Sequence, residues 1–466
     1  MDSPSEHTTR VLIVLLLAGV SFALSQTLVI PALPQISADL DASSTAASWI
    51  LTGFLLSASV ATPIVGKLGD VFGKGRMLTI VLLVFSAGSV ICALATSIGP
   101  MIAGRVIQGI AGGVFPLAFG IIRDTFPPEK MAAGLGMVSA IFGIGGGIGL
   151  PLSGVIVDNL DLSWLFWIAL IALPAALVAF KLVPESPSAE RTKIDWVGAL
   201  LLSIALASIL LGVTEANDWG WASLEILALL IGGVLLLGVW LRFEATLEQP
   251  LIELRILQRR AVATTNLAGL LIGFAMFSSF LLIPGFAQTP EATGYGFGMS
   301  VTGAGLILAP AAVAQFIAGP LAGKLGAHIG FRPTLAAGAG LVAATFGMLA
   351  VAHSHPWHFV VASILLGAGI SFGLASMANL IVGAVPQGDV GIATGLNTIT
   401  RTVGGAFGSA IATAILAGSV IGGGLPTEGA YTTAFALSSI GGVLAVGAAL
   451  LVPPKADVTA LAAEAA

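Results

Sequence analysis

Apolar runs of about 20 residues follow one another along almost the whole sequence, separated by short polar loops. An α-helix rises about 1.5 Å per residue, so each run is long enough to cross the hydrocarbon core of a bilayer, which is ~30 Å thick. Within that core every backbone polar group needs a partner inside the protein, and a helix provides one locally. The runs lie at 11–33, 47–66, 77–97, 100–122, 131–156, 163–183, 195–214, 223–243, 262–288, 300–322, 334–352, 358–383, 391–416 and 431–452. The sequence therefore predicts an all-α polytopic membrane protein with fourteen transmembrane helices.

The composition agrees with a membrane environment and excludes several functions. Of the 466 residues, 57% are hydrophobic and 9% are charged, whereas about a quarter of the residues in a soluble domain are charged. The sequence has one cysteine, Cys92, so an intramolecular disulfide and a CxxC metal or redox site are excluded. Nothing indicates a nucleic-acid partner. We expect membrane lipids around a monomeric chain.

The distribution of positive charge predicts the orientation in the membrane. With the N-terminus in the cytoplasm, sixteen of the eighteen Lys and Arg residues fall on the cytoplasmic side and none in the outer loops, which is the bias that sets topology. The first run, at 11–33, is too long for the core of a signal peptide, so we interpret it as a membrane helix. We therefore expect a multi-pass protein of a bacterial-type inner (plasma) membrane with both termini in the cytoplasm.

One polar loop occurs twice. GKLGDVFGKGR at 66–76 returns in weaker form as GKLGAHIGFRP at 323–333, and each copy follows one apolar run and precedes another. Such repeats in membrane proteins indicate two halves that rock about a shared site. The interval between the two copies spans eight helices, whereas a chain made only of two six-helix halves would place six helices between them. We predict an N-terminal six-helix bundle at 1–190, two inserted transmembrane helices at 191–250 and a C-terminal six-helix bundle at 251–466.

The first copy carries a family resemblance. Gly66-Lys-Leu-Gly-Asp70-Val-Phe-Gly73-Lys74-Gly-Arg76 resembles the loop motif between helices 2 and 3 of the major facilitator superfamily, and the chain resembles that superfamily's fourteen-helix drug/proton antiporter branch over nearly its whole length. The resemblance implies the major facilitator fold, with this loop latching the cytoplasmic ends of the helices. Physically, the glycines allow close turns and Asp70 can accept charge-assisted hydrogen bonds. A plain positive-inside loop explains the basic residues but not the repeat.

The fourth run contains a second motif. Arg105-Val-Ile-Gln108-Gly109 is similar to a family motif that places an arginine within the membrane, and the resemblance implies a role in proton coupling. Arg105 lies about 9 Å below the outer end of its helix, where charge is costly. The alternative is an arginine that snorkels to the interface. We expect Asp124, which follows Arg123 at the end of this run, to join the cytoplasmic charge network.

Glycines form a ridge in the fifth run. Gly143, Gly147, Pro151 and Gly154 resemble the family's antiporter motif, although Leu150 stands where the family has glycine. Glycines four residues apart let helices approach closely, and a proline allows the bundle to bend. Simple packing of small residues explains the ridge equally well.

The first run departs from the family pattern. Its segment from Leu24 to Pro34 resembles the first-helix signature of the branch, but Ser25 replaces the characteristic acid. A buried carboxylate is the simplest reversible proton carrier, and no other Asp or Glu lies clearly near a midplane. Proton coupling therefore rests on the resemblance alone.

Arg401 is the most informative residue outside the motifs. It lies about 15 Å from the cytoplasmic end of its run, near the middle of the bilayer, and Asn397 is one turn before it. An arginine at this depth is usually functional, and it can either hydrogen-bond helix carbonyls or receive an anionic or zwitterionic group of the substrate. Further polar residues expected at a central cavity are Ser25, Gln26, Asn266, Gln315 and Asn379. The alternative for each is a hydrogen bond that holds two helices together.

These observations predict a secondary active exporter of hydrophobic or amphipathic small molecules (multidrug efflux) that works by alternating access, driven by the proton gradient and without a cofactor. The first alternative is a dedicated exporter or facilitator for a lipid or natural product, anionic and not coupled to protons. A multi-pass lipid enzyme is less favoured, because no nucleophile, acid pair or metal cluster stands out. We interpret His353, His355 and His358 as a pH-sensitive outer loop rather than a metal site.

Overall fold

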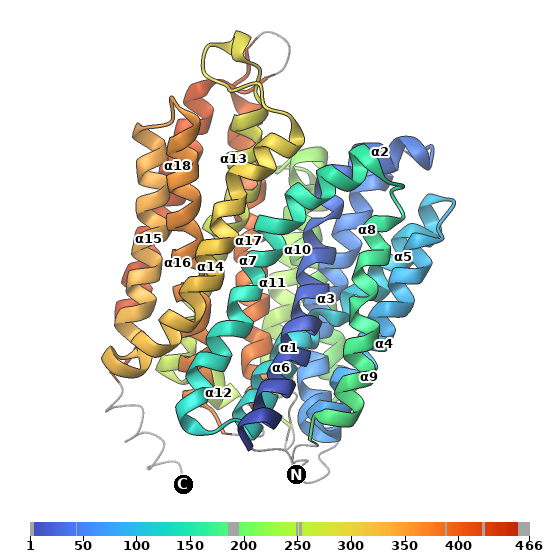
Figure 1. Ribbon diagram of the computed structural model, residues 1–466, viewed down its shortest axis with the longest axis vertical. Helices are drawn as coiled ribbons and strands as arrows, with labels where there is room; N and C mark the ends of the chain where they lie inside the picture. Colours follow the sequence, from blue (N-terminus) through green and yellow to red (C-terminus); the bar gives the residue numbers. More distant parts are fainter. Residues whose placement is uncertain are drawn as a thin grey trace.

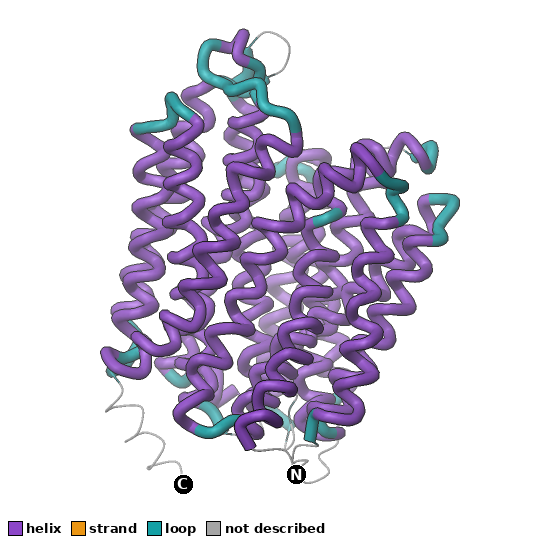
Figure 2. Tube along the Cα trace, viewed as in Figure 1, coloured by secondary structure: helices purple, strands orange, loops and turns teal. Residues whose placement is uncertain are grey.

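The computed structural model describes residues 4–42, 44–184, 195–247, 250, 254–386, 389–421 and 425–454. The described residues form long helices that run side by side with short connections at both ends (Figure 1, Figure 2). Thirteen helical spans in these ranges are long and apolar enough to cross a membrane, and α7 (Pro128–Asn159) occupies the remaining predicted run. The all-α prediction is confirmed, since the β structure in the same ranges is limited to one isolated bridge, between Val420 and Pro426.

The runs that precede the predicted inserted pair form helices, and three of these runs are interrupted. They are α1 (Pro4–Thr27), α2 (Val29–Asp39), α3 (Ser44–Phe72), α4 (Lys74–Ala93), α5 (Ile98–Gly109), η1 (Ile110–Gly113), α6 (Val114–Thr125), α7, α8 (Trp164–Trp167), η2 (Ile168–Ile171) and α9 (Ala172–Leu182). The first run is divided at Leu28 because Pro31 has no backbone N–H to donate to the Thr27 carbonyl. The fourth and sixth runs continue through the short 3₁₀ turns η1 and η2.

The remaining runs form longer, mostly unbroken helices. They are α10 (Trp196–Trp219), α11 (Leu224–Glu244), α12 (Leu254–Gln258), α13 (Arg260–Gln288), η3 (Glu291–Thr293), α14 (Val301–Ile329), α15 (Phe331–Val351), α16 (Pro356–Ala384), α17 (Val390–Gly418) and α18 (Glu428–Leu450). The predicted inserted pair, α10 and α11, begins at capping side chains, because Asp195 and Ser223 accept hydrogen bonds from the first free N–H groups. The domain boundaries at 190/191 and 250/251 stay predictions.

The apolar cores show where the two halves meet. We call the end of the molecule that carries 66–76 and 323–333 the basic end; α1 begins there and α18 ends there (Figure 1). The core of the first half continues at this end into residues of the second, which are Ile256, Ala261, Val262, Ala378, Ile381, Val382, Ala384, Val385, Val390 and Ala393. The core of the second half contains, from the described residues of the first, only the partly buried Ile30. The buried apolar core of the first half therefore joins the second half at the basic end.

The first glycine of each loop copy lies inside a helix and allows the halves to touch. A Cβ atom on Gly66 of α3 would stand 2.6 Å from the carbonyl oxygen of Gly391 in α17. A Cβ atom on Gly323 of α14 would stand 2.5 Å from the carbonyl oxygen of Ala132 in α7. Backbone cannot move aside as a flexible side chain can, so any larger residue would separate the helices. The repeated glycine thus allows close helix packing between the halves, in addition to the turn that each loop copy forms.

This packing gives the first prediction. We expect Gly323→Leu to lower the free energy of unfolding by about 1–3 kcal/mol, because the added side chain must displace the α7 backbone. Gly232→Leu in α11 is the matched control, since no atom lies within 4 Å of a Cβ built there. Thermal unfolding of the purified proteins in detergent measures both. Equal midpoints for the two variants would contradict the close approach.

Candidate functional site

Two buried carboxylates share one ammonium group at the basic end. Asp70 lies in the last turn of α3 and Lys74 begins α4, with exposed fractions of 4% and 3%. Between them the chain turns at Gly73, whose φ of 98° suits glycine. Lys74 Nζ lies 3.2 Å from Asp70 Oδ1 and 3.0 Å from Asp124 Oδ2. A buried charge is stable only when it is paired, so Lys74 holds the α3–α4 turn against the end of α6.

The same cluster reaches the other half of the protein. Asp70 Oδ2 would lie 2.9 Å from a Cβ atom on Gly391, in the first turn of α17. A carboxylate is favourable there because the unpaired N–H groups of a helix N-terminus carry partial positive charge. Arg123 of α6 donates hydrogen bonds to the carbonyl oxygens of Val385 at 3.0 Å and Pro386 at 3.3 Å, after the end of α16. Charged groups of the first half thus hold backbone ends of the second.

The structure brings together most of the residues predicted from the loop motif. Asp70, Gly73, Lys74 and Asp124 form the cluster, and Gly66 contacts α17 beside it. Arg76 lies on the exposed side of the first turn of α4. Sequence reasoning assigned no site role to Arg123, because nothing in its surroundings along the chain indicates that its partners are backbone carbonyls more than 260 residues away.

Arg105 of α5 is completely buried among neutral groups. Its Nε donates to the Ile50 carbonyl at 3.0 Å, and its Nη1 donates to Gln108 Oε1 at 2.8 Å. The guanidinium also lies over the ring of Phe54, 4.1 Å from its centroid, which is a favourable cation–π arrangement. Gln108 in turn donates to Ser89 Oγ at 2.8 Å. These contacts leave Nη2 of Arg105 without a hydrogen-bond partner among the described residues. A snorkelling arginine would instead reach the membrane surface.

Ser25 of α1 is the residue that faces this arginine. Arg105 Nη1 donates to the Ser25 carbonyl at 3.0 Å and to its hydroxyl at 3.1 Å. The resemblance implies an acid at position 25, and this is the position that contacts the guanidinium. Among the described residues, no carboxylate contacts it. Gly109, next to Gln108, lets α5 approach α3, because a Cβ atom on it would lie 2.5 Å from the Phe54 carbonyl oxygen.

The glycine ridge packs α7 against two other helices. Its predicted residues all lie in α7: Gly143, Gly147, Pro151 and Gly154. A Cβ atom on Gly154 would stand 2.6 Å from Thr302 Oγ1 of α14, and one on Gly145 would stand 2.6 Å from the Ala23 carbonyl oxygen of α1. The surroundings of the first two ridge glycines fall outside the described residues. The described part of the ridge serves close helix packing.

A small cavity of about 40 Å³ lies between the two halves. Its wall is mostly apolar, with hydroxyl groups, one amide and one charged side chain. The lining residues are Phe22, Gln26, Thr27, Leu55, Ala58, Ser59, Thr62, Gly112, Phe115, Met276, Phe277, Phe280, Thr398, Ile399, Arg401 and Thr402. Of the residues predicted for a central cavity, Gln26 and Arg401 line it. Apolar walls with a few polar groups are typical of sites for small molecules.

The other residues predicted for the cavity lie elsewhere. Ser25 contacts Arg105, as described above. Asn397 of α17 donates to Asn266 Oδ1 of α13 at 3.0 Å, and Asn379 donates to a carbonyl of its own helix, α16. Gln315 of α14 is also buried. The asparagine pair matches the alternative in which polar side chains hold membrane helices together. The sequence does not distinguish polar residues that line the cavity from those that pair with another helix, because helix periodicity does not identify the helix that a given face contacts.

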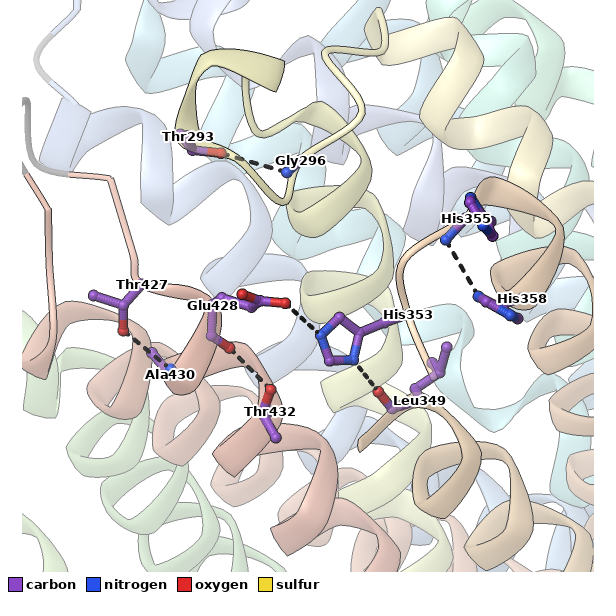
Figure 3. Close-up of polar contacts among 10 residues, drawn as sticks. All are labelled: Thr293, Gly296, Leu349, His353, His355, His358, Thr427, Glu428, Ala430 and Thr432. Atoms are coloured by element: carbon purple, nitrogen blue, oxygen red, sulfur yellow. Dashed lines mark hydrogen bonds and ion pairs between the residues drawn. The ribbon is translucent and has the colours of Figure 1, made fainter. Parts of the chain in front are cut away.

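The three histidines at the end opposite the basic end do not converge (Figure 3). His353 Nε2 lies 2.9 Å from Glu428 Oε1, and its Nδ1 lies 2.7 Å from the Leu349 carbonyl oxygen. Since both partners only accept, both contacts are hydrogen bonds when the imidazole carries two protons. His355 and His358 lie against each other, with ring centroids 5.6 Å apart. Within the described ranges, no group of three or more His, Cys, Asp or Glu side chains is arranged to hold a metal ion.

The arrangement defines a class of protein. Apolar helices long enough to span a membrane form two halves, the halves meet around a lined cavity, and buried charges cross between them at one end. Membrane transporters that work by alternating access have this organisation.

Comparison with known proteins identifies the family. The family model described as Major Facilitator Superfamily matches residues 15–296 and 265–466. The chain is 30% identical over 403 residues to an uncharacterized MFS-type transporter of Mycobacterium tuberculosis, covering 83% of this chain and 56% of that protein. It is 28% identical over 415 residues to multidrug resistance protein 3 of Bacillus subtilis, covering 87% of this chain and 79% of that protein. The chain belongs to the major facilitator superfamily and is a multi-pass membrane protein.

A solved structure supports the fold. The human organic anion transporter TETRAN superposes with a TM-score of 0.66 at 17% identity, covering 95% of this chain and 99% of that one. Similarity at this level of identity concerns the fold alone. The expected major facilitator architecture is therefore confirmed. The chain spans only 56% of the length of the Mycobacterium tuberculosis relative, so activity and substrates are not transferred from it.

The charge cluster at the basic end gives the second prediction. We expect Lys74→Met to lower the free energy of unfolding by about 3–5 kcal/mol, because the buried carboxylate of Asp70 then loses its ammonium partner. Lys67→Met is the matched control, since Lys67 is only partly buried on the same loop. Adding Asp70→Asn to Lys74→Met should recover part of the loss. Thermal unfolding measures the series, and a Lys74→Met protein as stable as Lys67→Met would contradict the pairing.

Proposed function

We propose that this chain is a secondary active exporter of hydrophobic and amphipathic small molecules. The observation that carries the proposal is the cavity between the halves, which combines aromatic and aliphatic surface with one guanidinium, that of Arg401. Apolar surface takes up the body of an amphipathic molecule, and a few polar groups orient it. The name of the Bacillus subtilis relative, multidrug resistance protein 3, supports drugs as the substrate class.

We propose that the basic end faces the cytoplasm of a bacterial-type inner membrane, with both termini inside. The strong bias of Lys and Arg toward this end supports the orientation. In the arrangement described here the basic end is closed, because the apolar core is continuous there and Arg123 binds the Val385 carbonyl. During transport these contacts open when the cavity faces the cytoplasm and form again after the substrate has moved outward.

The energy source in this proposal is the proton gradient, and no cofactor takes part. The support for proton coupling is the family resemblance of the Arg105 motif. The serine at position 25 cannot carry a proton at neutral pH as a carboxylate can. A second candidate function is therefore an exporter or facilitator of an anionic lipid or natural product without proton coupling. Ser25 opposite Arg105, and Arg401 in the cavity wall, favour this candidate.

Reconstitution tests the two candidates and gives the third prediction. Purified protein in lipid vesicles with an imposed pH gradient should move amphipathic dyes or drugs, with opposite proton movement reported by an internal pH dye. Arg401→Ala should lower kcat/KM for anionic probes at least about tenfold, a loss of ~1.4 kcal/mol, while Arg401→Lys keeps part of the activity. Substrate movement without proton flux would favour the second candidate. Failure to move any probe would refute both.

The contact between Ser25 and Arg105 gives the fourth prediction. Ser25→Asp places a carboxylate within hydrogen-bond reach of the guanidinium, and its charge can change with protonation. We expect this variant to move more protons per substrate molecule than the wild type. Ser25→Asn is the matched control, because it has the same size and no charge. Identical proton flux in the Asp and Asn variants would show that position 25 does not control coupling.

A further inference from the structure

A second and larger cavity borders the central one and has a wall made by the inserted helix α10. Its volume is about 300 Å³. The lining residues come from α3, α10, α13 and α17: Leu51, Thr52, Leu55, Leu56, Leu210, Thr214, Asn217, Asp218, Phe277, Thr402, Ala406, Ser409, Ala410 and Thr413. Leu55, Phe277 and Thr402 line both cavities. The two spaces are therefore adjacent to each other.

The position of α10 explains why this cavity exists. The helix contacts both α3 and α17, which also contact each other. Toward the basic end, its residues Leu202 and Leu206 share an apolar cluster with Ile392 and Ile399 of α17. Toward the opposite end, Asn217 donates a hydrogen bond to the Ala410 carbonyl at 3.1 Å. The inserted helix thus packs against one helix of each half and contributes to the wall of this cavity.

The polar groups of this wall are mostly acceptors. The hydroxyls of Thr402, Ser409 and Thr413 donate to carbonyls of their own helix, which leaves their lone pairs for a ligand. Asp218 is the one charged residue among the lining side chains. A carboxylate with hydroxyl oxygens around an apolar space suits an ammonium group on an apolar body. The charged residue that lines the central cavity is positive instead, because it is Arg401.

We propose that the two cavities form one composite site for amphipathic zwitterions, with the acidic group of the molecule at Arg401 and its protonated amine at Asp218. The proposal rests on the proposed export function and names its substrate class. The apolar body lies in the larger cavity, against Phe277 and Leu55, which face both spaces. The inserted helices then have a direct part in recognition, since the acidic subsite belongs to α10.

Three related fluorescent probes test the assignment by binding in detergent, without any gradient. Nα-dansyl-lysine carries a carboxylate and an amine, dansylcadaverine lacks the carboxylate, and Nα-dansyl-norleucine lacks the amine. We expect the wild type to bind dansyl-lysine most tightly. Asp218→Asn should weaken binding of dansyl-lysine and dansylcadaverine about tenfold and leave dansyl-norleucine unchanged, whereas Arg401→Ala should weaken dansyl-lysine and dansyl-norleucine instead. Asp161→Asn, an acid at the same end that lines a different cavity, should change nothing.

A labelling experiment keeps the proposal testable if Asp218→Asn fails to fold. In a Cys92→Ala background, Thr214→Cys presents one thiol in the wall of the α10 cavity. A membrane-impermeant thiosulfonate reagent should modify it, and dansyl-lysine should slow that modification severalfold while dansyl-norleucine slows it less. Absence of protection, or equal effects of Asp218→Asn on all three probes, would overturn the composite site. Selective binding without transport in vesicles would instead refute the proposed export function and leave the site standing.

Discussion

Backbone at glycine positions lets helices of the two halves approach closely, and the rest of the arrangement depends on this approach. Gly66 against Gly391 joins α3 to α17, and Gly323 against Ala132 joins α7 to α14. Because no side chain separates these helices, the charged groups at the basic end can bridge the halves directly. Asp70 reaches the first turn of α17 only because α3 and α17 already lie this close. The two copies of the loop therefore matter first as contact points.

The charges beside these contacts are not symmetric. Asp70 in the first copy has its counterpart in Ala327 of the second, so the buried acid and its lysine occur in one half only. The second copy keeps the contact glycine and the turn, at Gly330, whose φ is 97°. The closed basic end thus combines a packing element present in both halves with an electrostatic element present in one. The polar groups inside the membrane are asymmetric as well, since Arg105 is held by neutral groups within the first half whereas Arg401 of the second lines the cavity between the halves.

Much of the fold and part of the site could be predicted from the sequence. Run length and hydrophobicity suffice to predict fourteen helices, because a bilayer leaves a chain few other ways to satisfy its backbone. The loop motif predicted Asp70, Gly73 and Lys74, which are neighbours along the chain, and Asp124 was expected in the same charge network from its place at the end of the fourth run. The cavity was harder: Gln26 and Arg401 line it, but Asn266 and Asn397 bind each other instead. Periodicity gives the polar face of a helix, but it does not identify the helix that this face meets.

The sequence by itself determined the helical membrane architecture, the duplication and the positions of the two intramembrane arginines. Only the tertiary structure decided what those arginines touch. Ser25 and Arg105 are 80 residues apart and Arg123 lies 262 residues from Val385, yet each pair is in hydrogen-bond contact. The tertiary structure also shows that α10, which was predicted simply as an insertion, lines a cavity beside the one that Arg401 lines. The physical reason is that the membrane favours every apolar span in the same way, so hydrophobicity does not determine which helices contact each other. The contacts depend on local shape, because glycines allow particular helices to approach closely.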